Sequence, residues 1–225
     1  MSVLYRRYVK RLLDMVLSFM ALVVLLPLMA VIAICIRLTS NGPALFLQER
    51  IGLHGEPFRM IKFRSMVVGA EHMGAGYGME KEDPRITRIG KWLRATSLDE
   101  LPQLWNILVG AMSIVGPRPG LPYQVASYTQ EQARRLSVRP GVTGWAQIHG
   151  RNEIPWSKRI QLDLWYVDNL SLAVDLSIVF RTVLVILSRS GFRQDQLASE
   201  VEDFDTQSVD GPAGTSHTLL HKRRY

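Results

Sequence analysis

The feature that most constrains this chain is an uncharged, mostly apolar run of 22 residues at positions 15–36. As an α-helix the run would measure about 33 Å, which is enough to cross the hydrocarbon layer of a bilayer. It is longer than the apolar core of a typical secretory signal, and no cleavage site of small residues follows it. The sequence therefore predicts a membrane-inserted helix near the N-terminus.

Pro27 lies near the middle of this run. A proline removes one helical hydrogen bond and clashes with the preceding turn, so we expect a kink or a break there. Arginine and lysine residues flank the run on both sides, and positive residues resist translocation. This pattern favours a re-entrant helix-break-helix with both ends in the cytoplasm. A spanning helix that tolerates its proline is the alternative, and physics alone supports the two equally.

Composition divides the 225 residues into three parts. The hydrophobic content of 47% is too high for a disordered chain, and the charged content of 21% is too high for a polytopic membrane protein. We expect a membrane segment over 1–40, a folded domain over 41–193 and an acidic, disordered tail over 194–225. The net charge of +7 suits anionic lipid, nucleic acid or phosphorylated substrates.

Apolar spacing predicts a mainly α fold with one small β-hairpin. Two apolar-aromatic runs at 44–48 and 58–63 have the form of a hairpin, with Lys62 and Arg64 on one face. Later apolar stripes have helical spacing, and such amphipathic helices either face a core or lie in the membrane interface. The predicted helices cover 86–93, 98–108, 131–138 and 170–187.

The segment TSLDELPQLWNIL at 96–108 is the most suggestive for chemistry. Ser97 and Glu100 have capping-box spacing, which predicts a helix start at Ser97. Pro102 conflicts with that start, whereas a start at Asp99 would place the proline in the tolerated first turn. Either start puts two carboxylates at a helix N-terminus, where one can attack a phosphate and the other can hold a cation. The alternative is that Asp99 and Glu100 only complement the helix dipole.

Several cations can serve such a site. Arg118 stands between two prolines in VGPRPG at 115–120, and its planar guanidinium suits a phosphate, although a structural salt bridge is an alternative. Arg94 and Lys62 can add positive charge to the same site or be ordinary surface cations.

A glycine-rich segment, RPGVTGWAQIHGRN at 139–152, is the third candidate. Its Trp145, Gln147, Arg151 and Asn152 can bind a nucleotide base or a second phosphate, or the segment is a packed loop with one buried tryptophan. Further on, Asp163 and Tyr166 lie one helical turn apart, so they line the same cavity or the edge of a core.

Together these segments resemble the bacterial sugar transferase family, the monotopic phosphoglycosyl transferases. The matching strings keep the family's order and cover roughly residues 10–192. They are QERIG (48–52), KFRSM (62–66), DPRITRIGKWLRATSLDELPQLWNIL (83–108), MSIVGPRP (112–119), RPGVTGWAQIHGRN (139–152) and LDLWYV (162–167).

The resemblance implies an enzyme of the bacterial inner membrane with its catalytic domain on the cytoplasmic face. Such an enzyme moves a sugar-1-phosphate from a UDP-sugar to undecaprenyl phosphate and releases UMP. This is the first membrane step of capsule, exopolysaccharide, O-antigen or glycoprotein glycan assembly. The strings leave open which sugar is moved and in which pathway.

The resemblance also implies roles for residues. Asp99 matches the nucleophile that forms a covalent phosphosugar intermediate, and Glu100 matches a carboxylate associated with Mg²⁺, so these two are the expected metal ligands. Arg118 matches a phosphate-binding arginine. The remaining candidates for substrate binding are Lys62, Arg64, Arg94, Gln147, Arg151, Asn152 and Asp163.

Two features depart from the family pattern, and two other functions compete with it. Leu26 precedes Pro27 where the family often has serine, and the acidic tail has no counterpart that we identify. A hydrolase acting on pyrophosphate-linked lipids would use similar residues, and a non-catalytic basic module would bind the membrane surface. Nucleic acid is not expected, because the basic residues are dispersed among apolar stripes and no binding motif is found. Pairing of interfacial helices would permit a homo-oligomer.

Overall fold

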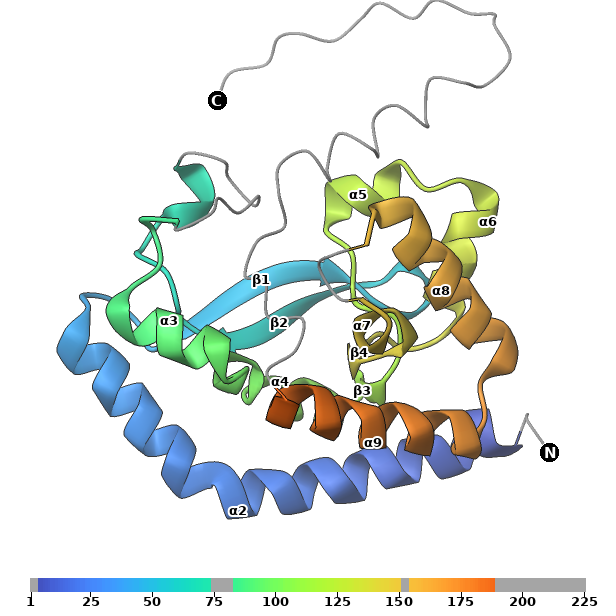
Figure 1. Ribbon diagram of the computed structural model, residues 1–225, viewed down its shortest axis with the longest axis horizontal. Helices are drawn as coiled ribbons and strands as arrows, with labels where there is room; N and C mark the ends of the chain where they lie inside the picture. The colour runs from blue at the N-terminus through green and yellow to red at the C-terminus, as the bar shows by residue number, and fades with distance from the viewer. Residues whose placement is uncertain (1–3, 74–82, 151–153, 189–225) are drawn as a thin grey trace, which may run out of the picture.

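A computed structural model describes residues 4–73, 83–150 and 154–188. It is mainly helical with one antiparallel hairpin, as the sequence predicts (Figure 1). The α-helices are α2 (Lys10–Thr39), α3 (Arg88–Ala95), α4 (Gln103–Val109), α5 (Pro122–Ala126), α6 (Gln130–Ala133), α7 (Trp145–Ile148), α8 (Trp156–Asn169) and α9 (Leu172–Ser188). Shorter helical turns are η1 (Tyr5–Val9), η2 (Leu53–Gly55), η3 (Ala70–His72), η4 (Leu98–Glu100) and η5 (Arg134–Ser137).

The apolar run forms the central part of α2, a single helix of 30 residues that contains Pro27. Figure 1 shows α2 bent near its middle as it passes under the rest of the molecule. The proline therefore kinks the helix, and the predicted separation into two helices is not found. Only 11% of the most apolar stretch of α2 is buried, and the helix is long and apolar enough to cross a membrane.

Both ends of α2 are attached to the same body. Near the N-terminal end, Lys10 pairs with Asp175 of α9 at 2.6 Å, and Asp14 accepts a hydrogen bond from the Ile114 backbone at 3.0 Å. Near the C-terminal end, Ile32 and Ile36 are buried in a cluster with Phe63, Leu93 and neighbouring side chains. The exposed apolar side chains of α2 concentrate between these attachments.

The predicted hairpin is confirmed. Strands β1 (Leu45–Ile51) and β2 (Pro57–Phe63) pair antiparallel, with Leu45 opposite Phe63 and Ile51 opposite Pro57. The Lys62 and Arg64 side chains bind different partners: Lys62 donates to Glu100, and Arg64, one residue past the end of β2, donates to Ser40 and Asn41.

A second ladder was not predicted. Strands β3 (Ser113–Val115) and β4 (Gly141–Thr143) pair in parallel, which joins segments far apart in the sequence. Glycines line this contact: a Cβ on Gly116 would lie 2.3 Å from the Arg139 carbonyl oxygen, and one on Gly144 would lie 2.2 Å from the carbonyl oxygen of Gly116. Only glycine permits backbones to approach this closely. We call the β3–β4 contact with Gly116, Gly141 and Gly144 the glycine seam.

The body is held by three buried apolar clusters, with α9 packed against β3 and β4 of the seam and α8 beside α7 (Figure 1). Tyr166 of α8 is 1% exposed, and its hydroxyl oxygen lies 2.7 Å from Asp175 Oδ1, to which it donates, and 3.2 Å from the Val115 carbonyl oxygen. Of the two readings of the Asp163–Tyr166 pair, Tyr166 therefore takes the core position. The predicted tail, 194–225, lies outside the described residues.

Candidate functional site

The segment that carries Asp99 and Glu100 forms a tight turn. Ser97 has a left-handed backbone conformation (φ 56°) and makes no side-chain cap, so the predicted capping box is wrong. Asp99 and Glu100 instead lie in the short helix η4, and Pro102 occupies the N-cap of α4, where the absence of an N–H is tolerated. A short helical turn begins directly after Ser97, but α4 begins only at Gln103, so the predicted helix over 98–108 is divided and neither predicted start is the start of α4.

Glu100 joins residues from three segments of the chain. Its Oε1 accepts hydrogen bonds from Arg118 Nη2 at 2.8 Å and from Lys62 Nζ at 3.3 Å. Lys62 reaches it from β2, and Arg118 comes from the loop after β3. Burial raises the pKa of Glu100, but the charges and hydrogen bonds of Arg118 and Lys62 outweigh it and lower that pKa to about 2. Glu100 is therefore a fixed anion at neutral pH.

Asp99 has a different electrostatic environment. It is 8% exposed, and burial together with the neighbouring charge of Glu100 raises its pKa to about 6. The nearby cations Lys62, Arg94 and Arg118 act in the opposite direction. Adjacent carboxylates with pKa values pushed apart are typical of catalytic sites, because each group can then take a separate role.

A second ionic cluster joins η5 to α8. Arg135 of η5 and Asp163 of α8 form an ion pair at 2.5 Å, and their side chains are only 4% and 3% exposed. The guanidinium of Arg135 also lies 5.6 Å from the centre of the Trp156 ring and 5.5 Å from that of Tyr128. Aromatic rings packed against a guanidinium restrict its motion, so this cluster is rigid.

Some buried polar atoms in this cluster have no hydrogen-bond partner in the part of the chain that the structure describes. They are both amide atoms of Gln147, Asp163 Oδ1 and Arg135 Nε. Buried polar groups are normally satisfied, and unsatisfied groups in a cavity are available to a bound ligand. The chemistry they offer is amide, carboxylate and guanidinium, which suits hydroxyl groups or a nucleobase.

One cavity of about 810 Å³ contains both clusters. Its lining also includes Leu17, Ser18 and Ala21 from the apolar run of α2 and Val179 and Val183 from α9. The cavity therefore extends from buried charged groups to the most apolar helix of the molecule.

The structure brings most of the predicted site residues to this cavity, but not all. Lys62, Arg94, Asp99, Glu100, Arg118, Gln147 and Asp163 line it together. Arg64 lines it too, but its guanidinium donates to the carbonyl oxygens of Ser40 and Asn41 at 2.8 and 2.7 Å, so it holds the end of α2. Trp145 stacks instead on Trp165, with ring centres 4.2 Å apart. Arg151 and Asn152 lie outside the described residues.

Sequence reasoning missed Arg135, Trp156 and Arg159, which also line the cavity. Arg135 follows Arg134 in a short helical turn, and only one of the two is buried, so nothing local distinguishes them. The signal that could have found Arg135 is Asp163, because a buried aspartate needs a cation.

The donor set can be tested against the expected Mg²⁺. Among the described residues, no group of three or more histidine, cysteine or acidic side chains is close enough to form a metal cage. Asp99 and Glu100 offer two adjacent carboxylates, and Mg²⁺ commonly takes one or two carboxylates together with substrate phosphates and water. The residues therefore fit a metal ion that is shared with a phosphorylated substrate.

Comparison with known proteins identifies the family of this chain. The family model for bacterial sugar transferases matches residues 5–189. The chain belongs to the bacterial sugar transferase family.

Individual members of the family are also similar. An uncharacterized sugar transferase of Bacillus subtilis, EpsL, is 47% identical over 159 residues, which cover 71% of this chain and 77% of that protein. The undecaprenyl-phosphate glucose phosphotransferase of Komagataeibacter xylinus is 42% identical over 195 residues, 81% of this chain and 37% of its own length. The undecaprenyl-phosphate galactose phosphotransferase of Salmonella typhimurium is 40% identical over 200 residues, 82% of this chain and 42% of its own. This chain thus matches less than half the length of these two phosphotransferases.

Proposed function

We propose that this sugar transferase moves a sugar-1-phosphate from a UDP-sugar to undecaprenyl phosphate and releases UMP. The observation that carries the proposal is the single cavity lined both by the Lys62–Glu100–Arg118 cluster with Asp99 and by apolar residues of α2. A transferase that brings a water-soluble nucleotide-sugar together with a lipid phosphate needs both kinds of surface at one place. The names of the similar phosphotransferases support the same reaction.

In the proposed reaction Asp99 is the nucleophile. Its carboxylate oxygen forms a bond to the sugar-bearing phosphorus of the donor, and the bond from that phosphorus to the UMP oxygen breaks. An oxygen of undecaprenyl phosphate then attacks the same phosphorus, and the Asp99 carboxylate leaves. The relay divides one difficult displacement between two anions into two easier ones.

Cations and the partner carboxylate support Asp99. Lys62 and Arg118 neutralise charge on the phosphoryl oxygens while Glu100 holds both in position. Asp99 and Glu100 would hold Mg²⁺, which supplies further charge neutralisation at the phosphates when bound. At the other end of the cavity, Gln147 and the Arg135–Asp163 pair bind the nucleoside or the sugar.

The attachment of both ends of α2 to one body supports a re-entrant position for this helix. A helix that crossed the bilayer would carry its ends to opposite sides, where one body could not hold both. We place the protein at the inner membrane with its body on the cytoplasmic face. In a Cys35→Ala background, cysteines replacing Ser2 and Ser40 should both react with a thiol reagent added from the cytoplasmic side. Labelling of one of them only from outside would establish a spanning helix.

The reaction is tested by intact mass of the detergent-solubilised protein, incubated with Mg²⁺ and a panel of UDP-sugars without a lipid acceptor. We expect a phosphosugar adduct with the preferred donor, and no adduct in the Asp99→Asn variant. UMP release only after undecaprenyl phosphate is added, with no adduct, would replace the covalent relay by direct displacement. Release of free sugar phosphate without any acceptor would instead establish a hydrolase.

A further inference from the structure

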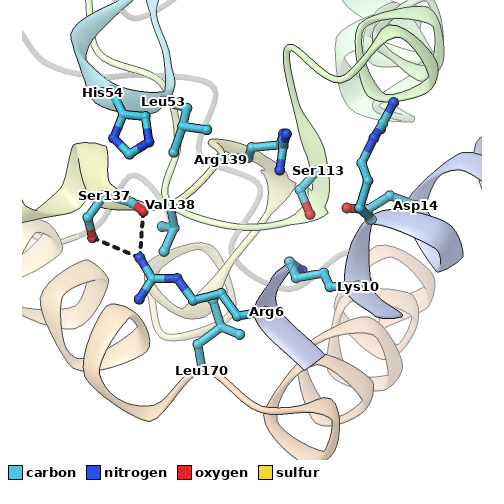
Figure 2. Close-up of a pocket in the computed structure, with 11 residues that line it drawn as sticks. Arg6, Lys10, Asp14, Leu53, His54, Ser113, Ser137, Val138, Arg139 and Leu170 are labelled. Atoms are coloured by element: carbon cyan, nitrogen blue, oxygen red, sulfur yellow. Dashed lines mark hydrogen bonds between the residues drawn. The ribbon is translucent and has the colours of Figure 1, made fainter. Parts of the chain in front are cut away.

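A second cavity, of about 580 Å³, lies beside the N-terminal end of α2 (Figure 2). It shares no lining residue with the cavity of the catalytic site. Its walls come from the start of α2, the turn of the β-hairpin, the start of β3 and the segment around η5. The lining residues are Arg6, Lys10, Arg11, Asp14, Leu53, His54, Ser113, Ser137, Val138, Arg139 and Leu170. We call this cavity the basic pocket.

The basic pocket has an excess of positive charge. Four of its lining side chains are lysine or arginine, and Asp14 is the one carboxylate among the lining residues. The Lys10 ammonium is neutralised by Asp175 at 2.6 Å. Asp14 itself accepts the Ile114 backbone N–H, so part of its hydrogen-bonding capacity is used by the protein.

The three arginines donate to neutral oxygens. Arg6 Nη2 lies 2.5 Å from the Ser137 carbonyl oxygen, Arg11 donates to the last carbonyls of α4, and Arg139 Nε donates to the Gly110 carbonyl at 2.9 Å. Within the described residues, none of these three guanidinium groups forms an ion pair. Three cations that line one pocket and donate only to neutral carbonyl and hydroxyl oxygens favour a bound anion.

The Ser113 hydroxyl independently indicates that this pocket binds a ligand. The residue is fully buried, and its hydroxyl has no hydrogen-bond partner among the described residues. Figure 2 shows this hydroxyl pointing into the pocket, between Arg139 and Asp14. A buried hydroxyl costs free energy unless a partner occupies the pocket, and a phosphate oxygen is such a partner.

The place of the pocket in the chain indicates where the anion comes from. Lys10, Arg11 and Asp14 are the last charged residues before the uncharged run of α2 begins at residue 15. Where an apolar helix enters a bilayer, the flanking residues lie at the level of the lipid headgroups.

We propose that the basic pocket binds the phosphate of an anionic phospholipid headgroup, with Arg6, Arg139 and the Ser113 hydroxyl as donors. A guanidinium presents a planar fork of N–H groups that matches phosphate oxygens. The bound lipid would hold the N-terminal end of α2 at the membrane surface. This binding is separate from the transfer reaction, so it can be present or absent whatever the catalytic site does.

The test uses the purified full-length protein in a nonionic detergent. Short-chain phosphatidylglycerol, short-chain phosphatidylcholine and inorganic phosphate are titrated separately, and affinity is taken from the concentration dependence of thermal stabilisation. We expect phosphatidylglycerol to stabilise the protein most. Arg6→Gln and Arg139→Gln should each weaken its binding about tenfold or more, since each removes a charge-assisted hydrogen bond. The matched control is Arg59→Gln, an exposed arginine of β2 outside both cavities, which should change the affinity less than about twofold.

Ser113→Ala distinguishes a loss of lipid binding from a loss of folding. It removes a hydroxyl that has no partner in the described structure, so the melting temperature without lipid should not fall, while phosphatidylglycerol affinity should drop. Unchanged affinity in all three pocket variants would overturn the proposal. Equal binding of phosphatidylcholine would also overturn it, and equal binding of inorganic phosphate would show a site for free phosphate in place of a headgroup.

Discussion

The two ends of the large cavity both pair carboxylates with arginine, but they hold their charges in different ways. At one end, Glu100 keeps two cations in place while its neighbour Asp99 has its pKa raised by burial. At the other end, Arg135 and Asp163 neutralise each other, and both side chains are almost fully buried. The first end has a carboxylate left over for chemistry, and the second has none.

The difference indicates that one end of the cavity supplies a reactive group and the other supplies rigidity. A carboxylate with a raised pKa that lies among three cations is held in a destabilised state, which is useful for attack on an electrophile and contributes little to folding. A buried ion pair that is stacked on aromatic rings gives shape and rigidity, and removing one partner leaves an unpaired charge. Substitutions at the two ends should therefore affect different measurements.

The largest effect is expected at Asp99. Asp99→Asn removes the proposed nucleophile, so turnover should fall by at least about 10³-fold. The melting temperature should stay the same or rise, because the variant no longer holds a buried carboxylate whose pKa is raised by desolvation. A melting temperature that fell along with activity would mean that Asp99 stabilises the fold, and the contrast between the two ends would fail.

The largest effect on stability is expected at Asp163. Asp163→Asn leaves the buried Arg135 guanidinium without a counter-charge, which should cost about 3 to 5 kcal/mol and lower the melting temperature by roughly 10 °C. The matched control is Asp168→Asn on the same helix, whose exposed pair with Arg134 should contribute less than about 1 kcal/mol. Equal melting temperatures for the two variants would show that the Arg135–Asp163 pair does not hold this end together.

A smaller effect is expected at Arg118. Arg118→Lys keeps the charge but loses the planar fork, so turnover should fall by roughly 10-fold to 100-fold. Stability should hardly change, because the Arg118 side chain is 46% exposed. Arg134→Lys, at a similarly exposed position, controls for the substitution itself. Near-normal turnover of Arg118→Lys would remove this residue from the phosphate site.

The smallest effect is a change in pH dependence. The proposed attack requires an ionised Asp99, so kcat/KM should fall about tenfold per pH unit below its pKa of about 6. Burial lowers the pKa of Lys62 to about 8, so kcat/KM should fall again above that pH as the ammonium loses its proton. Lys62→Arg should move the alkaline limb to higher pH and leave the acidic limb in place. An alkaline limb that did not move would have to come from another group.

Local patterns predicted the parts of the fold that local physics controls. The hairpin was found because alternation and turn residues specify it, and the kink at Pro27 was found because a proline must disturb a helix. The capping box failed at Ser97, where a left-handed backbone replaced the expected cap. The parallel β3–β4 ladder was missed because its strands have three residues each, too few to show a period.

The sequence also predicted some residues of the candidate site and missed others. Asp99, Glu100 and Arg118 were found from adjacent carboxylates, a proline-framed arginine and the family strings. Arg135 was not, because its role depends on Asp163, which is 28 residues away in the sequence. Arg64 was included by its neighbours in the sequence, although its guanidinium holds the end of α2.

The glycine seam lies next to residues from both ends of the large cavity. Arg118 follows Gly116 by two residues, and Arg135 donates to the Arg118 carbonyl at 3.2 Å, so both ends are connected to this one contact. The seam consists of main-chain atoms in close contact, and main-chain atoms cannot rotate out of the way as a side chain can. If the proposed function holds, we therefore expect relatives that take a larger or smaller sugar to differ in the side chains around the cavity and to keep the glycine seam unchanged.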